Sequence, residues 1–581
     1  MTRPKQFLAL LWICAACLSA CDNSPAPQPQ LETATLILTG GKIETVDAEL
    51  GTVAALAVRD HEIIAVGSVA DIDRYRGPAT SVINLEGRLV VPGFIEGHGH
   101  YLSYGRAQQI LDLGSLESFE EIVELVAASV DRAQPGQWIH GRGWHQEKWS
   151  SVPEPNVDGV PLNTDLNRIA PDNPVLLGHA SGHAVFANEA ALAAAGVDDN
   201  TPDPAGGTIV RTEHGRASGL LRESAQMLLQ AAASADEAAR PQAIQDAILR
   251  EQVKLAGQSA LRHGVTSFHD AGSNFATIDF LHKIEAEGGL PVRLYVMIGG
   301  QTIEELSVGL PTYYSPASDN DFLVVRSIKT VLDGALGSHG AWLLEPYQDI
   351  NHTSGLKLLP IDDLKKIAEL AISHGYQLNT HAIGTRANRE TLDVYQSAFT
   401  SAGGNPHSRR WRIEHAQHIH PDDIPRFGEL GVIAAIQGIH ATSDGPWIAA
   451  RLGANRTRLT SYRWRDLLDT GAVLNNGTDV PVEAINPILS FYSTVSRMQI
   501  NGEKFFPEQA ISRAEALKSY TLDNAFSAFE ETGKGSITSG KLADLVVLSR
   551  DILTIPEEQI PDTVVDYTIV GGNVVYQRSQ M

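Results

Sequence analysis

Cysteine is nearly absent from this chain of 581 residues. Its three cysteines stand at positions 14, 17 and 21, all inside an N-terminal segment that reads as an export signal. The body of the mature protein therefore contains no disulfide and no thiol nucleophile.

Positive charge is also scarce. Lysine and arginine together number 45, against 69 aspartates and glutamates, and the formal net charge is −24. Nucleic acids and anionic membrane surfaces attract basic proteins, so this balance argues against both as partners. Hydrophobic residues make up 43% of the chain, which is enough for a sizeable globular core.

Long apolar runs are missing as well. The N-terminal run "FLALLWICAACLSA" has 14 residues, whereas a helix that spans a membrane needs about 20. The run follows Arg3 and Lys5 and ends at "LSAC", which resembles the lipobox of bacterial lipoproteins. This resemblance implies a signal peptide over residues 1–21, lipidation of Cys21 and a Pro-rich tether over residues 22–33.

The expected location follows from that signal. An exported bacterial lipoprotein lies on the periplasmic side of a membrane, inner or outer, and touches lipid only through its N-terminal anchor. The alternative is plain secretion with cleavage nearby.

Short strands are predicted at both ends of the chain. Segments such as "TVAALAVRDHEIIAVG" and "VVDYTIVGGNVVYQ" contain β-branched runs separated by turn dipeptides. We expect residues 34–91 and 530–581 to form one composite β-sandwich.

The middle of the chain, residues 92–529, alternates strand-like and helix-like segments, which is typical of a parallel α/β fold. One helix is predicted to begin at Ser118, because Ser118 and Glu121 have capping-box spacing, and another to end at Gly264. The strand candidates are "RLVVPGFIEGHGH", "GVTSFHDA", "PVRLYVMIGG", "FLVVRSIKTVLDG", "YQLNTHAIG", "WRIEHAQ", "GVIAAIQ" and "AVLNNGTDVP". Eight strands separated by helices predict a (β/α)8 TIM barrel, with its active site at the C-terminal ends of the strands. The first two strands are too far apart for a simple loop, so we expect an inserted subdomain over about residues 101–245.

Residues that can bind a metal stand near the ends of these strands. His98 and His100 in "PGFIEGHGH" are two residues apart, so their side chains share one face of a strand. Four later strands end near Lys329, His381, His415 and Asp479. Taken singly, a strand histidine is usually a packed core residue, Lys329 reads as an amine that reaches water, and Asp479 reads as a turn residue. Together the four histidines and Asp479 predict a metal centre, because zinc-type metals take imidazole and carboxylate ligands, whereas Lys329 as an ammonium could not bind a metal.

Seven motifs resemble those of the amidohydrolase superfamily, and more narrowly its branch typified by N-substituted formamide deformylase. They are "PGFIEGHGH", "VTSFHDAG", "KTVLDGALGS", "THAIG", "RIEHAQ", "NGTDVPV" and "GSITSGKLADLVVL". The resemblance implies a barrel with a sandwich built from both chain ends and a centre of one or two divalent ions, zinc above all. His98 and His100 would bind the more buried ion, which Asp479 would also contact while handling protons. Lys329, carboxylated at its amine, would bridge to a second ion held by His381 and His415.

Three positions depart from the commonest forms of these motifs. Glu96 stands where aspartate is usual, Thr385 replaces an aspartate after "THAIG", and Thr478 replaces a serine before Asp479. None of these changes removes a proposed ligand. Glu96 shares the strand face of the two histidines and could still reach the site, whereas the change at Thr385 weakens any claim about the polar groups around His381.

Further residues are candidates for the substrate pocket. They are His183, Glu223, Trp144, His339, Gln437 and His440. For each of them the alternative is a residue with a packing or surface role only.

The function expected from these features is hydrolysis of a small-molecule amide. A metal-activated hydroxide would attack a non-peptide C–N bond of an N-substituted amide, with formamide as one candidate, and Asp479 would act as general base and then acid. The same site could act on a cyclic imide, a carbamate or an ester. A lipoprotein that binds a small molecule without turnover is the remaining alternative, and a homodimer is left open.

Overall fold

The computed structural model describes residues 33–579, except 147–148, 181–183, 205 and 318–321. The predicted signal peptide with Cys21, nearly all of the tether, and His183 therefore lie outside the described residues. Within the described part of the chain, no helix is both long and apolar enough to cross a membrane.

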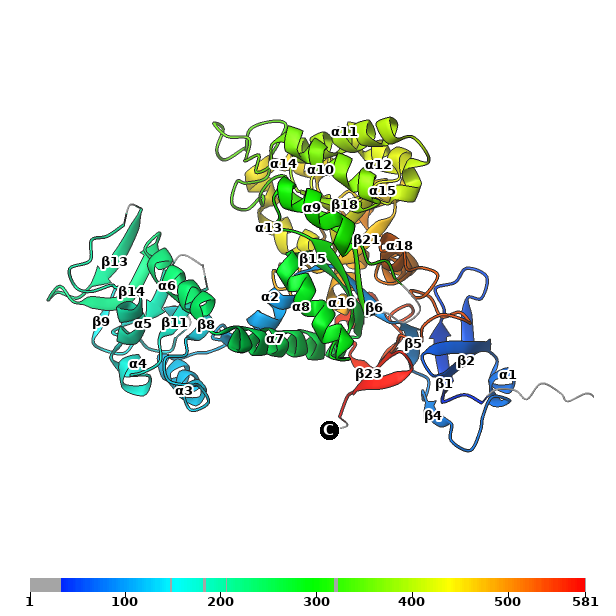
Figure 1. The fold of residues 1–581 in the computed structure, drawn as a ribbon, viewed down its shortest axis with the longest axis horizontal. Coiled ribbons are helices and arrows are strands. Elements are labelled where there is room, and N and C mark those ends of the chain that lie inside the picture. The colour runs from blue at the N-terminus through cyan, green and yellow to red at the C-terminus, as the bar shows by residue number, and fades with distance from the viewer. Residues whose placement is uncertain (1–32, 147–148, 181–183, 205, 318–321, 580–581) are drawn as a thin grey trace, which may run out of the picture.

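Eight parallel strands form the predicted barrel, and they follow one another around the sheet in chain order (Figure 1). In that order they are β6 (Phe94–Gly99), β15 (Val265–Ser273), β16 (Arg293–Ile298), β17 (Leu323–Val331), β18 (Gln377–Ala382), β19 (Arg412–His415), β20 (Ile433–Gln437) and β21 (Leu474–Gly477). All eight predicted strands are confirmed. Most of their residues are buried on both faces, as is usual for a parallel sheet covered by helices, and the buried residues include polar ones such as Asn379 and Asn475.

The barrel is nearly closed by contacts between its first and last strands. The backbone N–H of Asp479 donates to the carbonyl of His98 at 2.8 Å, and that of His100 donates to the carbonyl of Val480 at 2.8 Å. The chain therefore leaves β6 and β21 side by side, directly at the predicted ligands.

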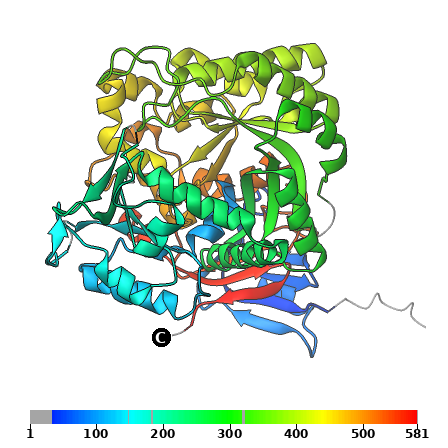
Figure 2. The same ribbon diagram turned by 60° about the vertical axis from the view of Figure 1, so that its left-hand side comes forward.

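Helices cover the outside of the barrel (Figures 1 and 2). They include α7 (Gln242–Arg262), α8 (Phe275–Ala286), α9 (Ile303–Tyr313), α10 (Ile361–His374), α11 (Thr385–Ala402), α12 (Ile424–Leu430), α13 (His440–Leu452), α14 (Ala454–Thr460), α15 (Trp464–Asp469), α16 (Pro487–Ser496), α17 (Arg513–Ser519) and α18 (Leu522–Ser527). The predicted end of α7 is confirmed, since the helix stops two residues before Gly264, whose φ of 77° suits glycine.

The two ends of the chain join in one mixed β domain, as predicted. Its strands are β1 (Leu36–Glu44), β2 (Thr52–Arg59), β3 (Glu62–Gly67), β4 (Ser81–Asn84), β5 (Leu89–Pro92), β22 (Leu545–Leu548), β23 (Val565–Val570) and β24 (Asn573–Gln577). Strand β1 shifts register between Thr39 and Ile43, and it pairs with β4 before the shift and with β5 after it.

The residues between β6 and β15 include a separate lobe with a six-stranded sheet. Its strands are β7 (Leu111–Asp112), β8 (Ile139–Trp144), β11 (Val175–His179), β12 (Ala184–Ala187), β13 (Gly207–Arg211) and β14 (Ala217–Glu223). Its helices are α3 (Phe119–Val130), α4 (Thr164–Ile169), α5 (Glu189–Ala194) and α6 (Gln226–Ala239). The capping box predicted at Ser118 and Glu121 is confirmed at the start of α3. Helices α2 (Tyr101–Ala107) and α7 link the lobe to the barrel, and Figure 1 shows the lobe lying beyond α7.

Candidate metal centre

Three of the predicted ligands meet where β6 and β21 end. The ligand atoms of His98, His100 and Asp479 all lie within 4.8 Å of one another. Oδ1 of Asp479 is 3.6 Å from Nε2 of His98 and 3.3 Å from Nε2 of His100. This is the arrangement that the spacing of His98 and His100 predicted, with one carboxylate added from the last strand.

Two more histidines continue the cluster. The ring centroid of His415 is 4.9 Å from that of His98 and 4.3 Å from that of His381. His381 and His415 come from β18 and β19, whereas Asp479 follows β21, the last strand of the barrel, which lies next to β6.

The backbone is strained at two of these positions. His415 has a φ of 73° and Asp479 a φ of 59°, both in the left-handed region that residues other than glycine rarely adopt. Strain of this kind persists where the surrounding structure imposes it, and it gathers at functional sites. The chain therefore bends at the end of β19 and just after β21, and these bends turn the side chains of His415 and Asp479 toward the centre of the cluster.

Burial keeps the imidazoles neutral. It lowers the pKa of His98 to about 4 and that of His381 to about 3, and in both cases the nearby Lys329 amine adds to the effect. Burial would raise the pKa of Asp479, but the imidazoles of His100, His98 and His415 outweigh it and hold that pKa well below its usual range. At neutral pH the cluster therefore offers neutral nitrogens beside a charged oxygen, the donor set of a divalent metal site.

Unpaired polar atoms at the centre fit this interpretation. Nε2 of His98, Nε2 of His381 and Oδ1 of Asp479 are buried and form no hydrogen bond within the described residues. Leaving such atoms unpaired is costly, so native proteins rarely do it without a reason. Ligation of a divalent cation would satisfy all three at once.

Lys329 lies on β17 among these groups, and its side chain is partly exposed. Its amine is 3.5 Å from the carbonyl oxygen of Ala271, a weak contact. Burial lowers the pKa of the amine, while the charges of Glu414 and Asp479 act in the opposite direction. The structure thus brings all six predicted ligands into one neighbourhood.

A buried ion pair behind His98 was missed by the sequence interpretation. Glu414 accepts a hydrogen bond from Nδ1 of His98, and its carboxylate also pairs with Arg412, with Nε to Oε1 at 2.7 Å. Glu414 and Arg412 are both 0% exposed. Carboxylates in this position orient a ligating imidazole and fix which nitrogen faces the metal. The signal was present in "WRIEHAQ", where opposite charges two residues apart share one face of a strand.

Asp333 was missed as well. Its carboxylate accepts backbone hydrogen bonds from Trp342, Ile383 and Gly384, and Oδ1 lies 3.5 Å from Nε2 of His381. Burial raises the pKa of Asp333 to about 7, although the three backbone hydrogen bonds act to lower it. Thr385, by contrast, accepts a hydrogen bond from the backbone of Leu344 at 3.0 Å. The polar group beside His381 therefore comes from the end of β17.

Two of the predicted pocket residues border the centre. Nδ1 of His415 is 2.8 Å from Oε1 of Gln437, which fixes the imidazole through a hydrogen bond. The His440 ring lies nearly parallel to that of His415, with centroids 6.4 Å apart, and its Nε2 is buried without a partner among the described residues.

The other predicted pocket residues lie elsewhere. Trp144 is 2% exposed and belongs to the core of the inserted lobe, where its indole N–H donates to the carbonyl of Leu177. Its packing supports the alternative of a core residue. His339 contacts Asp349 at 3.0 Å, and Glu223 is exposed at the end of β14. Their roles toward a substrate stay predictions.

Comparison with known proteins decides the family. The profile described as "Amidohydrolase family" matches residues 81–576. The chain belongs to the amidohydrolase family. The resemblance seen in the seven motifs is thereby confirmed, and His98, His100 and Asp479 form the metal site of a metal-dependent amidohydrolase.

Relatives within this family match over almost the whole chain. The amidohydrolase is 34% identical to the protein LONG AFTER FAR-RED 3 of Arabidopsis thaliana, over 94% of this chain and 92% of that protein. It is 27% identical to N-substituted formamide deformylase of Arthrobacter pascens, over 94% of this chain and 98% of the other. The solved structure of an uncharacterized metal-dependent hydrolase from Pyrococcus furiosus matches with a TM-score of 0.71 at 26% identity, covering 89% of this chain and all of that one.

Proposed function

We propose that this amidohydrolase cleaves a non-peptide C–N bond of an N-substituted amide, with formamides as the first candidates. One observation carries the proposal. The histidines and the aspartate expected from the deformylase-like motifs meet at one end of the barrel, in a chain 27% identical to N-substituted formamide deformylase over nearly its whole length.

The metal we propose is zinc, as one or two ions. His98, His100 and Asp479 would hold one ion, and His381 and His415 a second. A structure of atrazine chlorohydrolase from Arthrobacter aurescens complexed with zinc shares the fold, with a TM-score of 0.51 at 13% identity over 93% of this chain and 95% of that one. When bound, such an ion supplies a Lewis acid and lowers the pKa of its water to about 7.

Lys329 is proposed to act as a carboxylated amine. Its nitrogen would add to the carbon of carbon dioxide and lose a proton, which leaves a carbamate with an anionic oxygen. That reaction needs a neutral amine, and the lowered pKa of Lys329 favours it. The carbamate would bridge the two ions, whereas an ammonium could bind neither.

Asp479 is proposed to move the proton. Its carboxylate lies next to His98 and His100, and Oδ1 forms no hydrogen bond within the described residues, so the group is placed to accept a proton from the attacking water. The same group then returns the proton to the departing nitrogen, which an amide needs before the C–N bond breaks. General acid–base catalysis of this kind contributes about 10²–10⁴ in rate. Gln437 would assist by holding the His415 ring at Nδ1, so that Nε2 faces the ion.

The test combines metal content with turnover. Plasma mass spectrometry on the wild-type chain, on Lys329→Ala and on the matched control Lys283→Ala, an exposed lysine of α8, counts the ions bound. We expect about two zinc ions in the wild type and the control, and fewer in Lys329→Ala. Release of formate from a series of N-substituted formamides then follows in the zinc-loaded wild type.

Each outcome of that test bears on a different part of the proposal. One ion in all three proteins would reject the carbamate bridge but leave a single-metal hydrolase. If the zinc-loaded protein cleaves an imide, a carbamate or an ester but no amide, the class of the cleaved compound replaces the proposed substrate class. Absence of bound metal under zinc-replete conditions would revive the binding-protein alternative.

The location is also a proposal. Lipidation of Cys21 and removal of residues 1–20 would tether the enzyme to the periplasmic face of a membrane. Metabolic labelling with a palmitate analogue tests it, with Cys21→Ala as the variant that should lose the label.

A further inference from the structure

The inserted lobe and the barrel do not share a hydrophobic core. The buried apolar residues of the lobe form two clusters, whose members all lie between Leu111 and Ala233. The core of the barrel includes residues of α2 and α7, but no described residue from 105 to 248. Units with separate cores move relative to each other unless a large apolar interface joins them. The lobe is therefore a separate body attached to the barrel.

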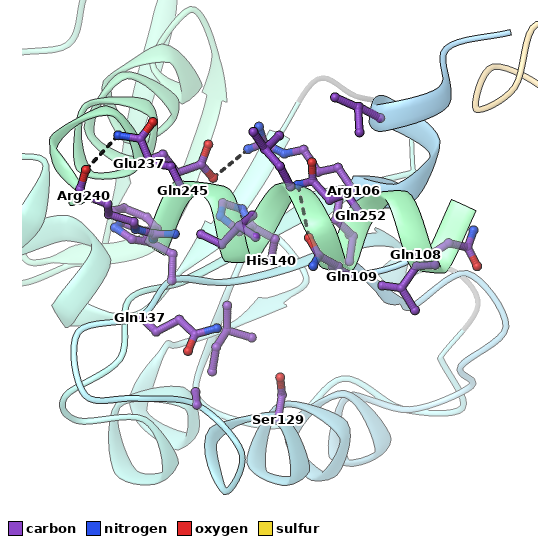
Figure 3. A pocket seen from close by; sticks show the side chains of 18 of the residues that line it. Arg106, Gln108, Gln109, Ser129, Gln137, His140, Glu237, Arg240, Gln245 and Gln252 are labelled. Carbon is purple, nitrogen blue, oxygen red and sulfur yellow. Dashed lines mark hydrogen bonds and ion pairs between the residues drawn. The ribbon is translucent and has the colours of Figure 1, made fainter. Parts of the chain in front are cut away.

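The interface between the two bodies is incompletely filled. It leaves a cavity of about 1010 Å³, with α2 and α7 on the barrel side and α3, β8 and α6 on the lobe side (Figure 3). Among the described residues, the only ion pair that joins the lobe to the barrel side is that of Arg106 with Glu237, at 2.9 Å, and both side chains are partly exposed. An exposed ion pair contributes little to stability, so this contact does not fix the position of the lobe.

Two short segments connect the bodies. Residues 108–110 lie between α2 and β7, and residues 240–241 lie between α6 and α7. The two helices on the barrel side are held tightly together, because a Cβ added to Gly105 of α2 would lie only 2.1 Å from the carbonyl oxygen of Gln252 in α7. A rotation of the lobe would therefore be taken up by the two connecting segments, as at other domain hinges of a few residues.

The lobe is attached at the end of the barrel where the metal ligands gather. His100 is the N-cap residue of α2, and α2 leads directly to the first connecting segment. Figure 1 shows α2 on the side of the barrel toward the lobe. A rotation about the connecting segments thus takes place next to the metal centre.

The metal centre is open to solvent in this arrangement. The side chain of His100 is 36% exposed, and Val331 is 44% exposed. Val331 shares a strand face with Lys329 and is the neighbour of His381 in the sheet register, so its side chain lies at the mouth of the centre. Many enzymes exclude bulk water from the reacting groups by closing a loop or a domain over the bound substrate. In this chain the lobe is the body placed to do so.

We propose that the inserted lobe is a hinged lid, which rotates about residues 108–110 and 240–241 and closes over the metal centre when a ligand is bound. Closure would remove Val331 and the exposed edge of His100 from bulk water. The cavity at the junction gives the lobe room to turn. The inference concerns the metal site itself and holds for whichever bond the site cleaves.

Distances between two spin labels test the hinge. The full chain is prepared with serine in place of its three cysteines, all of which precede residue 22, so that only introduced cysteines carry a label. The lobe pair combines Glu213→Cys, in the exposed turn between β13 and β14, with Val482→Cys, at an exposed position three residues after Asp479. This pair spans the lobe and the mouth of the metal centre.

The matched control pair combines Val308→Cys with Val564→Cys. Both valines are exposed and lie outside the lobe, and their neighbours Leu310 and Val565 belong to one core, so the distance between them should not change. Double electron–electron resonance measures both pairs in the zinc-loaded chain. Each is measured without a ligand and then with acetohydroxamate, a small metal-binding probe, at a concentration that saturates its binding in calorimetry.

Without a ligand, the distance distribution of the lobe pair should be broader than that of the control pair. With acetohydroxamate its mean should shorten by more than about 2 Å, the scale of a domain rearrangement, while the control pair stays unchanged. A lobe pair as narrow as the control pair would overturn the hinge, and a broad distribution whose mean does not shorten in zinc-loaded protein would overturn the lid.

The proposed function is tested separately. Zinc is counted in the same samples, so a chain that binds no zinc contradicts the proposed zinc centre, while the width of the ligand-free distribution still decides the hinge. No outcome depends on amide hydrolysis, because both pairs report distances and not turnover.

Discussion

The carboxylate of Glu96 accepts two hydrogen bonds from Thr478, the residue directly before Asp479. The backbone N–H of Thr478 donates to Oε1 at 2.5 Å, and its hydroxyl donates to Oε2 at 3.0 Å. Both residues are 0% exposed. Burial raises the pKa of Glu96 to about 8, and the hydrogen bonds from Thr478 limit that rise.

This contact explains two departures from the usual motifs together. Glu96 replaces an aspartate and Thr478 replaces a serine, and the two changed residues bind each other. Glu96 therefore acts on the site indirectly, by binding Thr478, the residue before Asp479. It helps to hold the left-handed turn, at a φ of 59°, that aims the Asp479 carboxylate at the histidines.

Removing the Thr478 hydroxyl tests that relationship. Thr478→Val keeps the shape but leaves Glu96 with one donor fewer, so the free energy of unfolding should fall by about 1–3 kcal/mol. The matched control is Thr400→Val, on the exposed side of α11, where the change should stay within about 0.5 kcal/mol. Urea unfolding measures both. Equal stability of Thr478→Val and wild type would mean that this hydrogen bond is not needed to hold the turn.

The ion pair behind His98 should matter for both stability and metal affinity. Glu414→Gln leaves the Arg412 guanidinium buried without a counter-charge, and breaking such a pair costs about 3–5 kcal/mol of unfolding free energy. It also removes the carboxylate that orients His98, so zinc affinity should fall about 10–100-fold. Urea unfolding and a competitive zinc chelator measure the two effects.

The control for Glu414→Gln is a pair near the surface. Arg465 and Glu515 form two contacts, of 3.0 Å and 2.5 Å, with partly exposed side chains, so Glu515→Gln should cost no more than about 1 kcal/mol and leave zinc affinity unchanged. Unchanged zinc affinity in Glu414→Gln would show that His98 is oriented by its own packing.

The fold could be predicted from the sequence because its signals are local. The barrel strands are short segments bounded by turn residues, and eight of them separated by helices admit few topologies. His98 and His100 were predictable for the same reason, since two residues on one strand share a face.

The rest of the site was harder to predict because it depends on contacts between strands distant in sequence. Glu414 reaches His98 across 316 positions, and Glu96 reaches Thr478 across 382. Asp333 is unremarkable in the sequence, and its role appears only where the ends of β17 and β18 meet. Trp144 shows the converse, because an aromatic residue near a glycine turn fits a pocket wall and a packed core equally well.

Replacing Asp479 by asparagine should separate catalysis from fold. Asparagine keeps the size of the side chain but cannot take up the proton, so kcat on the best amide substrate should fall by about 10²–10⁴. Far-ultraviolet circular dichroism should not change. The matched control is Asp444→Asn, because Asp444 lies on α13 and accepts hydrogen bonds from Tyr462 and Gln417 outside the ligand set. An Asp479→Asn variant that turns over as fast as the control would reject the proton role.

His418 gives the protein an acid sensitivity that a single variant should remove. It is 0% exposed beyond the end of β19, where its Nδ1 lies 2.9 Å from the hydroxyl oxygen of Ser461. Burial lowers its pKa to about 3, so the folded state keeps this imidazole neutral while the unfolded state takes up a proton near pH 6.5. The unfolded state therefore binds more protons between those two values, and stability falls as the pH falls through that window.

For this one group, the loss of stability between pH 7 and pH 5 should be about 2 kcal/mol, because each pH unit well below 6.5 costs about 1.4 kcal/mol. His418→Gln keeps a polar group beside Ser461 but cannot titrate, so its unfolding free energy should decline less over that range by the same amount. His214→Gln, at an exposed imidazole of the inserted lobe, should follow the wild-type slope. Urea unfolding at pH 7, 6 and 5 compares the three proteins. If the unfolding free energies of His418→Gln and wild type fall equally as the pH is lowered, the His418 region opens and lets the imidazole take up its proton before the molecule unfolds.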